Sequence, residues 1–123
     1  MEMIMMKPKK SKMQKRQNIQ LSAQDVSAVL CALPLISYYE TGSEIQDQIN
    51  DALMTTAMEK LATRSTNFVP NEYRIIYTAI ALAVNMETYL PDIQIDPEWK
   101  ADLQHHFFTL NRLHALTKDQ IYK

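Results

Sequence analysis

The segment from residue 75 to residue 86 constrains the fold most, because it is apolar on almost every side of a helix. Its apolar residues are Ile75, Ile76, Tyr77, Ala79, Ile80, Ala81, Leu82, Ala83, Val84 and Met86. A helix that lacks a broad polar face belongs in the interior of a protein. We therefore predict that this helix lies at the centre of the fold, surrounded by other helices or covered on one side by a second copy of the chain.

Apolar residues at helical spacing, together with start and stop signals, predict four helices. The first covers residues 23–39, and the second follows a cap at Thr41 and runs to about Arg64. The third covers residues 70–89, and the fourth follows a cap at Asp96 and fades after Leu116.

Individual capping residues and prolines support these boundaries. Pro34 has no N–H to donate, so the first helix must kink or restart there. Thr41 and Glu44 have the spacing of a capping box. Pro70 and Pro97 suit the first position of a helix, where a backbone N–H has no partner inside the helix.

Two of the predicted helices are amphipathic. The apolar stripe of the second helix consists of Ile45, Ile49, Leu53, Met54, Ala57, Met58 and Leu61. The predicted buried stripe of the fourth consists of Trp99, Leu103, Phe107, Leu110 and Leu113, with Glu98, Asp102, His105, Thr109 and Arg112 on its other side. No segment competes as a strand, so we predict an all-α protein, a compact domain resembling a four-helix bundle.

Charge divides the chain into a basic tail, residues 1–20, and a single helical domain, residues 21–123. Residues 1–17 carry a net charge of +5, whereas residues 18–123 carry −6. The tail contains Pro8 and shows no helical period, so we expect it to be flexible.

The chain lacks the residue patterns of common enzymes. A nucleotide-binding loop or a nucleophile elbow needs several glycines, and Gly42 is the only one. Cys31 cannot form an internal disulfide, and its apolar neighbours suggest a buried thiol, which suits a reducing cytoplasm. No apolar run has the length of a membrane span. We expect a cytoplasmic protein without enzymatic activity, cofactor or catalytic residue.

Histidines and acids offer no convincing metal site. His106 and His114 are eight residues apart, about 12 Å along a helix, and His105 points about 100° away from His106. Packed or partly buried imidazoles explain these residues better than metal ligands. The second helix carries Glu44, Asp47 and Asp51 on one face, but a solvated acidic face is commoner than a cation site.

Two functions remain from different classes. Nucleic-acid binding through the basic tail is one, because clustered cations can neutralise phosphates without a folded motif. The candidate contact residues are Lys7, Lys9, Lys10, Lys12, Lys15 and Arg16. A helix-turn-helix with Gly42 in its turn is disfavoured, since its recognition helix, residues 43–51, would contain three acids and no base.

Protein docking is the function that we prefer, with a second copy of the chain and an unidentified protein as partners. Its support is the strongly apolar third helix, the methionines of the second helix, and five tyrosines, Tyr38, Tyr39, Tyr73, Tyr77 and Tyr89. The alternative reading of these residues is that they fill one core. The basic tail of one copy can also lie along the acidic Glu44, Asp47 and Asp51 face of another.

Overall fold

The structure is a computed structural model of the chain, and it describes residues 21–65 and 67–121. The predicted basic tail, residues 1–20, lies outside the described residues. All regular structure in the described residues is helical, without a strand, which confirms the predicted all-α class. Within the described residues, the four predicted helices correspond to six α-helices and one 3-10 helix. The first predicted helix restarts near Pro34, as expected, whereas the breaks in the third and fourth were not predicted.

The helices follow one another with short connections. In chain order they are α2 (Ala23–Ala32), the 3-10 helix η1 (Leu33–Tyr38), α3 (Glu44–Ala62), α4 (Pro70–Val84), α5 (Met86–Tyr89), α6 (Pro97–His105) and α7 (Phe107–Ile121).

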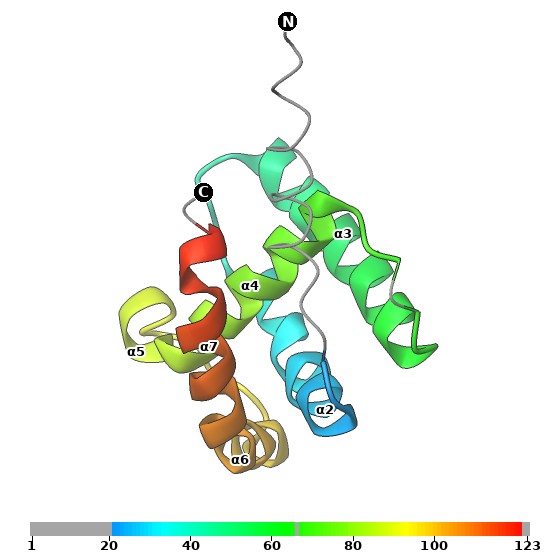
Figure 1. Cartoon of the computed structure of the whole chain (residues 1–123). Helices are drawn as coiled ribbons and strands as arrows, with labels where there is room; N and C mark the ends of the chain where they lie inside the picture. Colours follow the sequence, from blue (N-terminus) through cyan, green and yellow to red (C-terminus); the bar gives the residue numbers. More distant parts are fainter. Residues whose placement is uncertain (1–20, 66, 122–123) are drawn as a thin grey trace, which may run out of the picture.

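Helix α4 occupies the centre, as its sequence predicts. Figure 1 shows α4 passing between α3 and α7, and it also packs against α2 and η1. Its buried residues surround most of the helix and include Ile76, Ile80 and Leu82. Burying each such side chain stabilises the fold by about 1.5 to 3 kcal/mol. Helix α4 is therefore the element around which α2, η1, α3 and α7 pack.

The first break follows Ala32 and has the cause that the sequence indicates. Helix α2 ends there, and the chain continues as η1 with Pro34 near its start. Proline cannot donate the next hydrogen bond of an α-helix, whereas it fits the start of a new turn. The buried side chains of Leu33, Leu35 and Ile36 hold η1 against α4.

Helix α3 corrects two predictions. Its N-cap is Ser43, whose hydroxyl accepts a hydrogen bond from the Gln46 N–H, and not Thr41. Thr41 instead donates its hydroxyl to Asp47 Oδ1 at 2.7 Å. Of the predicted apolar stripe, only Ala57 and Leu61 are fully buried, while Ile45 and Ile49 at the other end of the helix are exposed, Ile45 by 72%.

The predicted third helix ends early, at Asn85. The backbone N–H and the side-chain Nδ2 of Asn85 both donate to the Ala81 carbonyl oxygen, at 3.0 Å and 3.2 Å. An asparagine side chain that bonds to its own helix competes with the regular ladder. The backbone leaves the helical region at Asn85, and the separate short helix α5 follows.

The predicted fourth helix breaks at His106, where φ is −93° and ψ is 4°. This break divides α6 from α7 and changes which side chains are buried. Phe107, predicted to be in the core, is half-exposed, whereas Thr109, predicted to face solvent, is buried. Leu110 and Leu113 are buried as predicted.

Candidate functional site

The six cations that the sequence nominates for binding nucleic acid or an acidic partner lie outside the described residues. They are Lys7, Lys9, Lys10, Lys12, Lys15 and Arg16. The candidate site that the structure adds is a groove between α5, α6 and the first turn of α7.

The groove has a volume of about 820 Å³. The end of α4 and α5 form one side, residues 90–95 form another, and α6 with Phe107 closes it. Its apolar lining includes Val84, Met86, Leu90, Ile93, Ile95 and Phe107. The charged residues that line it are one acid, Glu87, and one base, Lys100, and both are exposed.

Both helix breaks lie next to this groove, since Asn85 and Phe107 are among the residues that line it. The connection after α5 is anchored by the buried Leu90, whose N–H donates to the Met86 carbonyl oxygen at 2.8 Å. Ile93 and Ile95 follow and pack partly against the core.

Two adjacent phenylalanines begin helix α7, and one of them lines the groove. Phe107 lines it and is 45% exposed, whereas Phe108 is 82% exposed. Neighbouring residues of a helix point about 100° apart, so the Phe108 side chain does not follow Phe107 into the groove. Single exposed apolar side chains are normal on folded proteins.

A second apolar surface lies on the first half of α3, which we call the α3 ridge. It consists of Ile45 and Ile49, with the half-buried Leu53 continuing it. The acidic side chains Glu44 and Asp51 on the same half of the helix are exposed. The α3 ridge is therefore apolar with an acidic border.

The fold brings Cys31, Asp102 and His106 to one shallow depression between α2 and α6, which sequence distance did not predict. Burial, followed by the charge of Asp102, raises the pKa of the Cys31 thiol. A thiol with a raised pKa is protonated at neutral pH and is a poor nucleophile. The Cys31 carbonyl oxygen has a structural role, because it accepts a hydrogen bond from the Trp99 indole at 2.8 Å.

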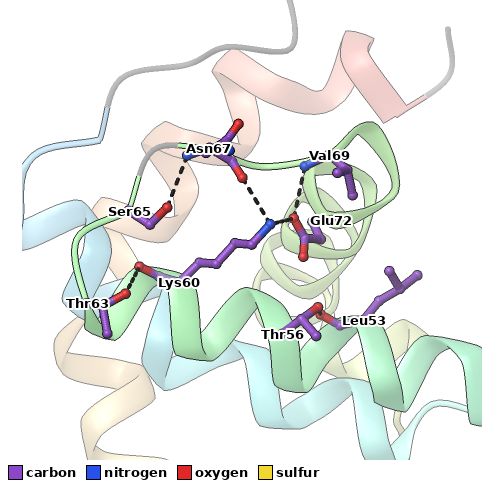
Figure 2. Close-up of polar contacts among 8 residues, drawn as sticks. All are labelled: Leu53, Thr56, Lys60, Thr63, Ser65, Asn67, Val69 and Glu72. Carbon is purple, nitrogen blue, oxygen red and sulfur yellow. Dashed lines mark hydrogen bonds and ion pairs between the residues drawn. The ribbon is translucent and has the colours of Figure 1, made fainter.

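An ion pair between α3 and α4 fixes the connection from Asn67 to Glu72 between these two helices. Figure 2 shows Lys60 Nζ donating to Glu72 Oε1 at 2.7 Å and to the Asn67 carbonyl oxygen at 2.9 Å. The Val69 N–H donates to the same carboxylate oxygen at 2.9 Å. The buried Glu72 carboxylate therefore caps α4 through the Val69 N–H and holds α3 beside it through Lys60.

A second ion pair joins α2 to α7. Asp25 is buried and accepts hydrogen bonds from the Ser22 N–H and from the Arg112 guanidinium. The first pair joins consecutive helices and the second joins helices 87 positions apart. Neither pair contributes a residue to the lining of the groove, so we assign both to stability.

The remaining titratable candidates carry no site. Burial raises the pKa of Tyr77 to about 12 and also raises that of Tyr73, so both phenols are neutral and belong to the core. Of the other tyrosines that the sequence offered for docking, Tyr38 and Tyr89 are exposed and Tyr39 is half-buried. Within residues 21–65 and 67–121, no three His, Cys, Asp or Glu side chains are grouped so as to hold a metal ion.

None of the described helices is both long enough and apolar enough to cross a membrane. No family model matches the chain, and neither a curated protein nor a solved structure is significantly similar to it.

Proposed function

We propose that this protein is a non-enzymatic docking module that acts by binding proteins and associates with itself. The observation that carries the proposal is the apolar groove beside α5, with the half-exposed Phe107 in its wall. Aromatic side chains at the centre of an interface carry much of its binding energy. In this proposal residues 21–123 form the module, a compact bundle around α4, and its single cysteine suits the cytoplasm.

The chemistry of the groove favours a protein partner over a small molecule. Sites for small ligands combine an apolar lining with a few buried polar groups that fix the orientation of the ligand. Most polar side chains that line this groove, such as Glu87, Gln94, Lys100 and Gln104, are exposed and so lie at its rim. An apolar floor with a polar rim is the usual anatomy of a protein interface.

Sedimentation velocity of the full chain tests this proposal. We expect the average mass to rise between about 1 µM and about 500 µM protein, which is the range in which weak interfaces associate. A monomer at every concentration would contradict self-association.

The alternative function is nucleic-acid binding through residues 7–16. One observation favours it, the net charge of +5 over residues 1–17 against −6 over the rest of the chain. Fluorescence anisotropy with labelled DNA and RNA should show binding that weakens steeply with salt and disappears when residues 1–17 are deleted. Binding that survives this deletion would contradict the role of the tail.

A further inference from the structure

We infer that the α3 ridge is the docking site of the chain's own basic tail, residues 1–20, with the cations of the tail beside the acids that border the ridge. The inference does not rest on the groove or on the proposed function. It depends on the surface of the α3 ridge, on the distribution of charge along the chain and on the length of the tail.

The surface of the α3 ridge is the first step. Ile45 is 72% exposed and Ile49 is 47% exposed, and residues four positions apart lie on the same side of a helix. Glu44 and Asp51 are exposed on the same half of α3. The only base of α3, Lys60, is already held in the ion pair with α4. A segment that covers this surface must therefore be basic and must also carry apolar side chains.

The distribution of charge is the second step, and it identifies that segment. Residues 21–59 hold six acids and no base, whereas residues 60–123 hold seven acids and seven bases. Asp25 already pairs with Arg112, and the other five acids of residues 21–59 lie on α3 or just before it. Residues 1–17 carry the opposite net charge, +5. Opposite charges steer two surfaces together.

The same comparison separates the α3 ridge from the groove. The groove is lined by one acid and one base, so it offers no net charge to attract the tail. Of the two apolar surfaces, only the α3 ridge has a charge complementary to that of residues 1–17.

The tail also supplies apolar side chains. Methionine is unbranched and polarizable, so it fills irregular apolar surfaces. A segment that combines cations with such residues can pair with the acids of α3 and cover Ile45 and Ile49 together. The methionines and isoleucines of the tail are Met1, Met3, Ile4, Met5, Met6, Met13 and Ile19.

The length of the tail is the third step. Leu21 precedes α2, which begins at the opposite end of the molecule from the first turn of α3 (Figure 1). An extended chain spans about 3.3 Å per residue, so residues 1–20 reach at most about 66 Å from Leu21. Helix α3 is about 28 Å long, so the tail can follow it from one end to the other.

The covalent connection favours the tail of the same copy over that of another copy. A joined segment has an effective concentration on the order of 1 mM at its site. At micromolar protein, the chain's own tail therefore occupies the α3 ridge before the tail of a second copy does. The cations nominated for nucleic acid are then paired within the chain.

Paramagnetic broadening of amide NMR signals measures this contact in the full chain. A nitroxide is attached at Ser11→Cys in a chain that also carries Cys31→Ala, so that only one thiol reacts. The label should broaden the amides of residues 44–53 more than those of α6, and reduction of the nitroxide should restore them. Equal broadening of both regions would overturn the docking.

Charge substitutions at exposed positions test the acidic border. An exposed ion pair changes an equilibrium constant by about 1.4-fold to about fivefold. Glu44→Gln with Asp51→Asn should therefore lower the ratio of docked to undocked tail by about twofold to about 25-fold, and lower the broadening with it. Asp92→Asn with Glu98→Gln is the matched control, because it removes two exposed acids from the part of the chain without net charge. It should leave the broadening unchanged.

An apolar substitution tests the ridge itself. Ile45→Ser should also lower the broadening, because it removes the most exposed apolar side chain of α3. Leu116→Ser, at a position of α7 that is 58% exposed, is the matched control and should have no effect. Circular dichroism should show unchanged helical content in all variants.

A mixed sample separates the two possible sources of the tail. Labelled chains without ¹⁵N are mixed with ¹⁵N chains without the label, so that only a contact between copies broadens the observed signals. At about 100 µM protein we expect little broadening of residues 44–53 in the mixture, because the connected tail has the higher effective concentration. Broadening as strong as in the labelled ¹⁵N chain would overturn the contact within one copy.

The outcomes separate this inference from the proposed function. Broadening of residues 44–53 that survives Glu44→Gln with Asp51→Asn, or that survives Ile45→Ser, would overturn the inference. Broadening that a control variant abolishes would overturn it as well. None of these results depends on whether the chain associates with itself, which sedimentation velocity measures separately.

Discussion

Replacing Glu72 with glutamine tests whether the ion pair between α3 and α4 stabilises the fold. Glutamine keeps the volume and can still accept from the Val69 N–H, but it removes the negative charge that pairs with Lys60 (Figure 2). A hydrogen bond to a charged group contributes about 1.5 to 3 kcal/mol. The Lys60 side chain is 31% exposed, so water can hydrate its ammonium after the change. We expect Glu72→Gln to lower the unfolding free energy by about 2 kcal/mol and Tm by about 8 °C.

The loss should depend on pH. Burial raises the pKa of Glu72, but hydrogen bonds from Lys60, Val69 and Thr56, together with the Lys60 charge, lower it below its ordinary value of 4.5. A carboxyl group with a lower pKa in the folded state stabilises the fold above its unfolded pKa, and that contribution is lost as the pH falls through the folded pKa. Glutamine does not titrate. The difference in unfolding free energy between wild type and Glu72→Gln should therefore be full at neutral pH and shrink below 4.5.

Urea unfolding followed by helical circular dichroism at pH about 7 and about 3.5 measures this difference. Glu59→Gln is the matched control, because Glu59 is an exposed acid on α3, one position before Lys60. It should change the unfolding free energy by less than about 0.5 kcal/mol. A Glu72→Gln loss as small as that of the control, or one of the same size at both pH values, would refute the argument.

Four further predictions concern the rest of the described fold. Ile80→Asp should unfold the protein, because Ile80 is 1% exposed in the most apolar helix, and an unchanged melting temperature would contradict the central position of α4. Arg64→Gly should raise the unfolding free energy by about 1 kcal/mol in urea titrations, because φ at Arg64 is 63°, a left-handed conformation that costs less for glycine. A fall in the unfolding free energy would show that the Arg64 side chain contributes more than this relief. Arg112→Met should lower the unfolding free energy by about 1 to 2 kcal/mol, because it leaves the buried Asp25 without its cation. A double-mutant cycle with Asp25→Asn that gives no coupling energy would show that the ion pair is not the cause. Iodoacetamide at neutral pH should modify Cys31 more slowly in the folded chain than in urea, because burial raises its pKa, and equal rates would contradict a protected thiol.

The central helix and several boundaries could be predicted from sequence because local chemistry determines them. The apolar residues before Asn85 cover most sides of α4, so a helix with this pattern is not expected on the surface of the protein. Pro34 ends α2 through its missing N–H, and Pro70 and Pro97 begin α4 and α6 where that N–H is not needed.

Exposure of the α3 ridge could not be predicted in the same way. Periodicity identifies which face of a helix is apolar, but it does not say how far along the helix a neighbour covers that face. Ile45 and Ile49 continue the stripe that is buried at Ala57 and Leu61, yet they remain exposed. The same period of apolar residues is expected whether a longer core or a binding partner covers Ile45 and Ile49.

The two helix breaks beside the groove carry weak sequence signals. Asparagine and histidine both occur within helices of other proteins, so only the hydrogen bonds of Asn85 and the dihedral angles of His106 reveal the interruptions. The ion pair between Asp25 and Arg112 spans 87 positions, so sequence spacing offers no hint of it. The exposure of Phe108 could have been predicted, since Phe107 and Phe108 point about 100° apart on one helix and cannot both face the core.

Dilution of the wild-type chain, followed by amide NMR chemical shifts, tests the central claim of docking through the groove most directly. If the protein docks through the groove, amide shifts should change with concentration at residues 84–95 and 100–108, while those of the α3 ridge stay constant. Concentration-independent shifts throughout the chain, or changes confined to the α3 ridge, would contradict it.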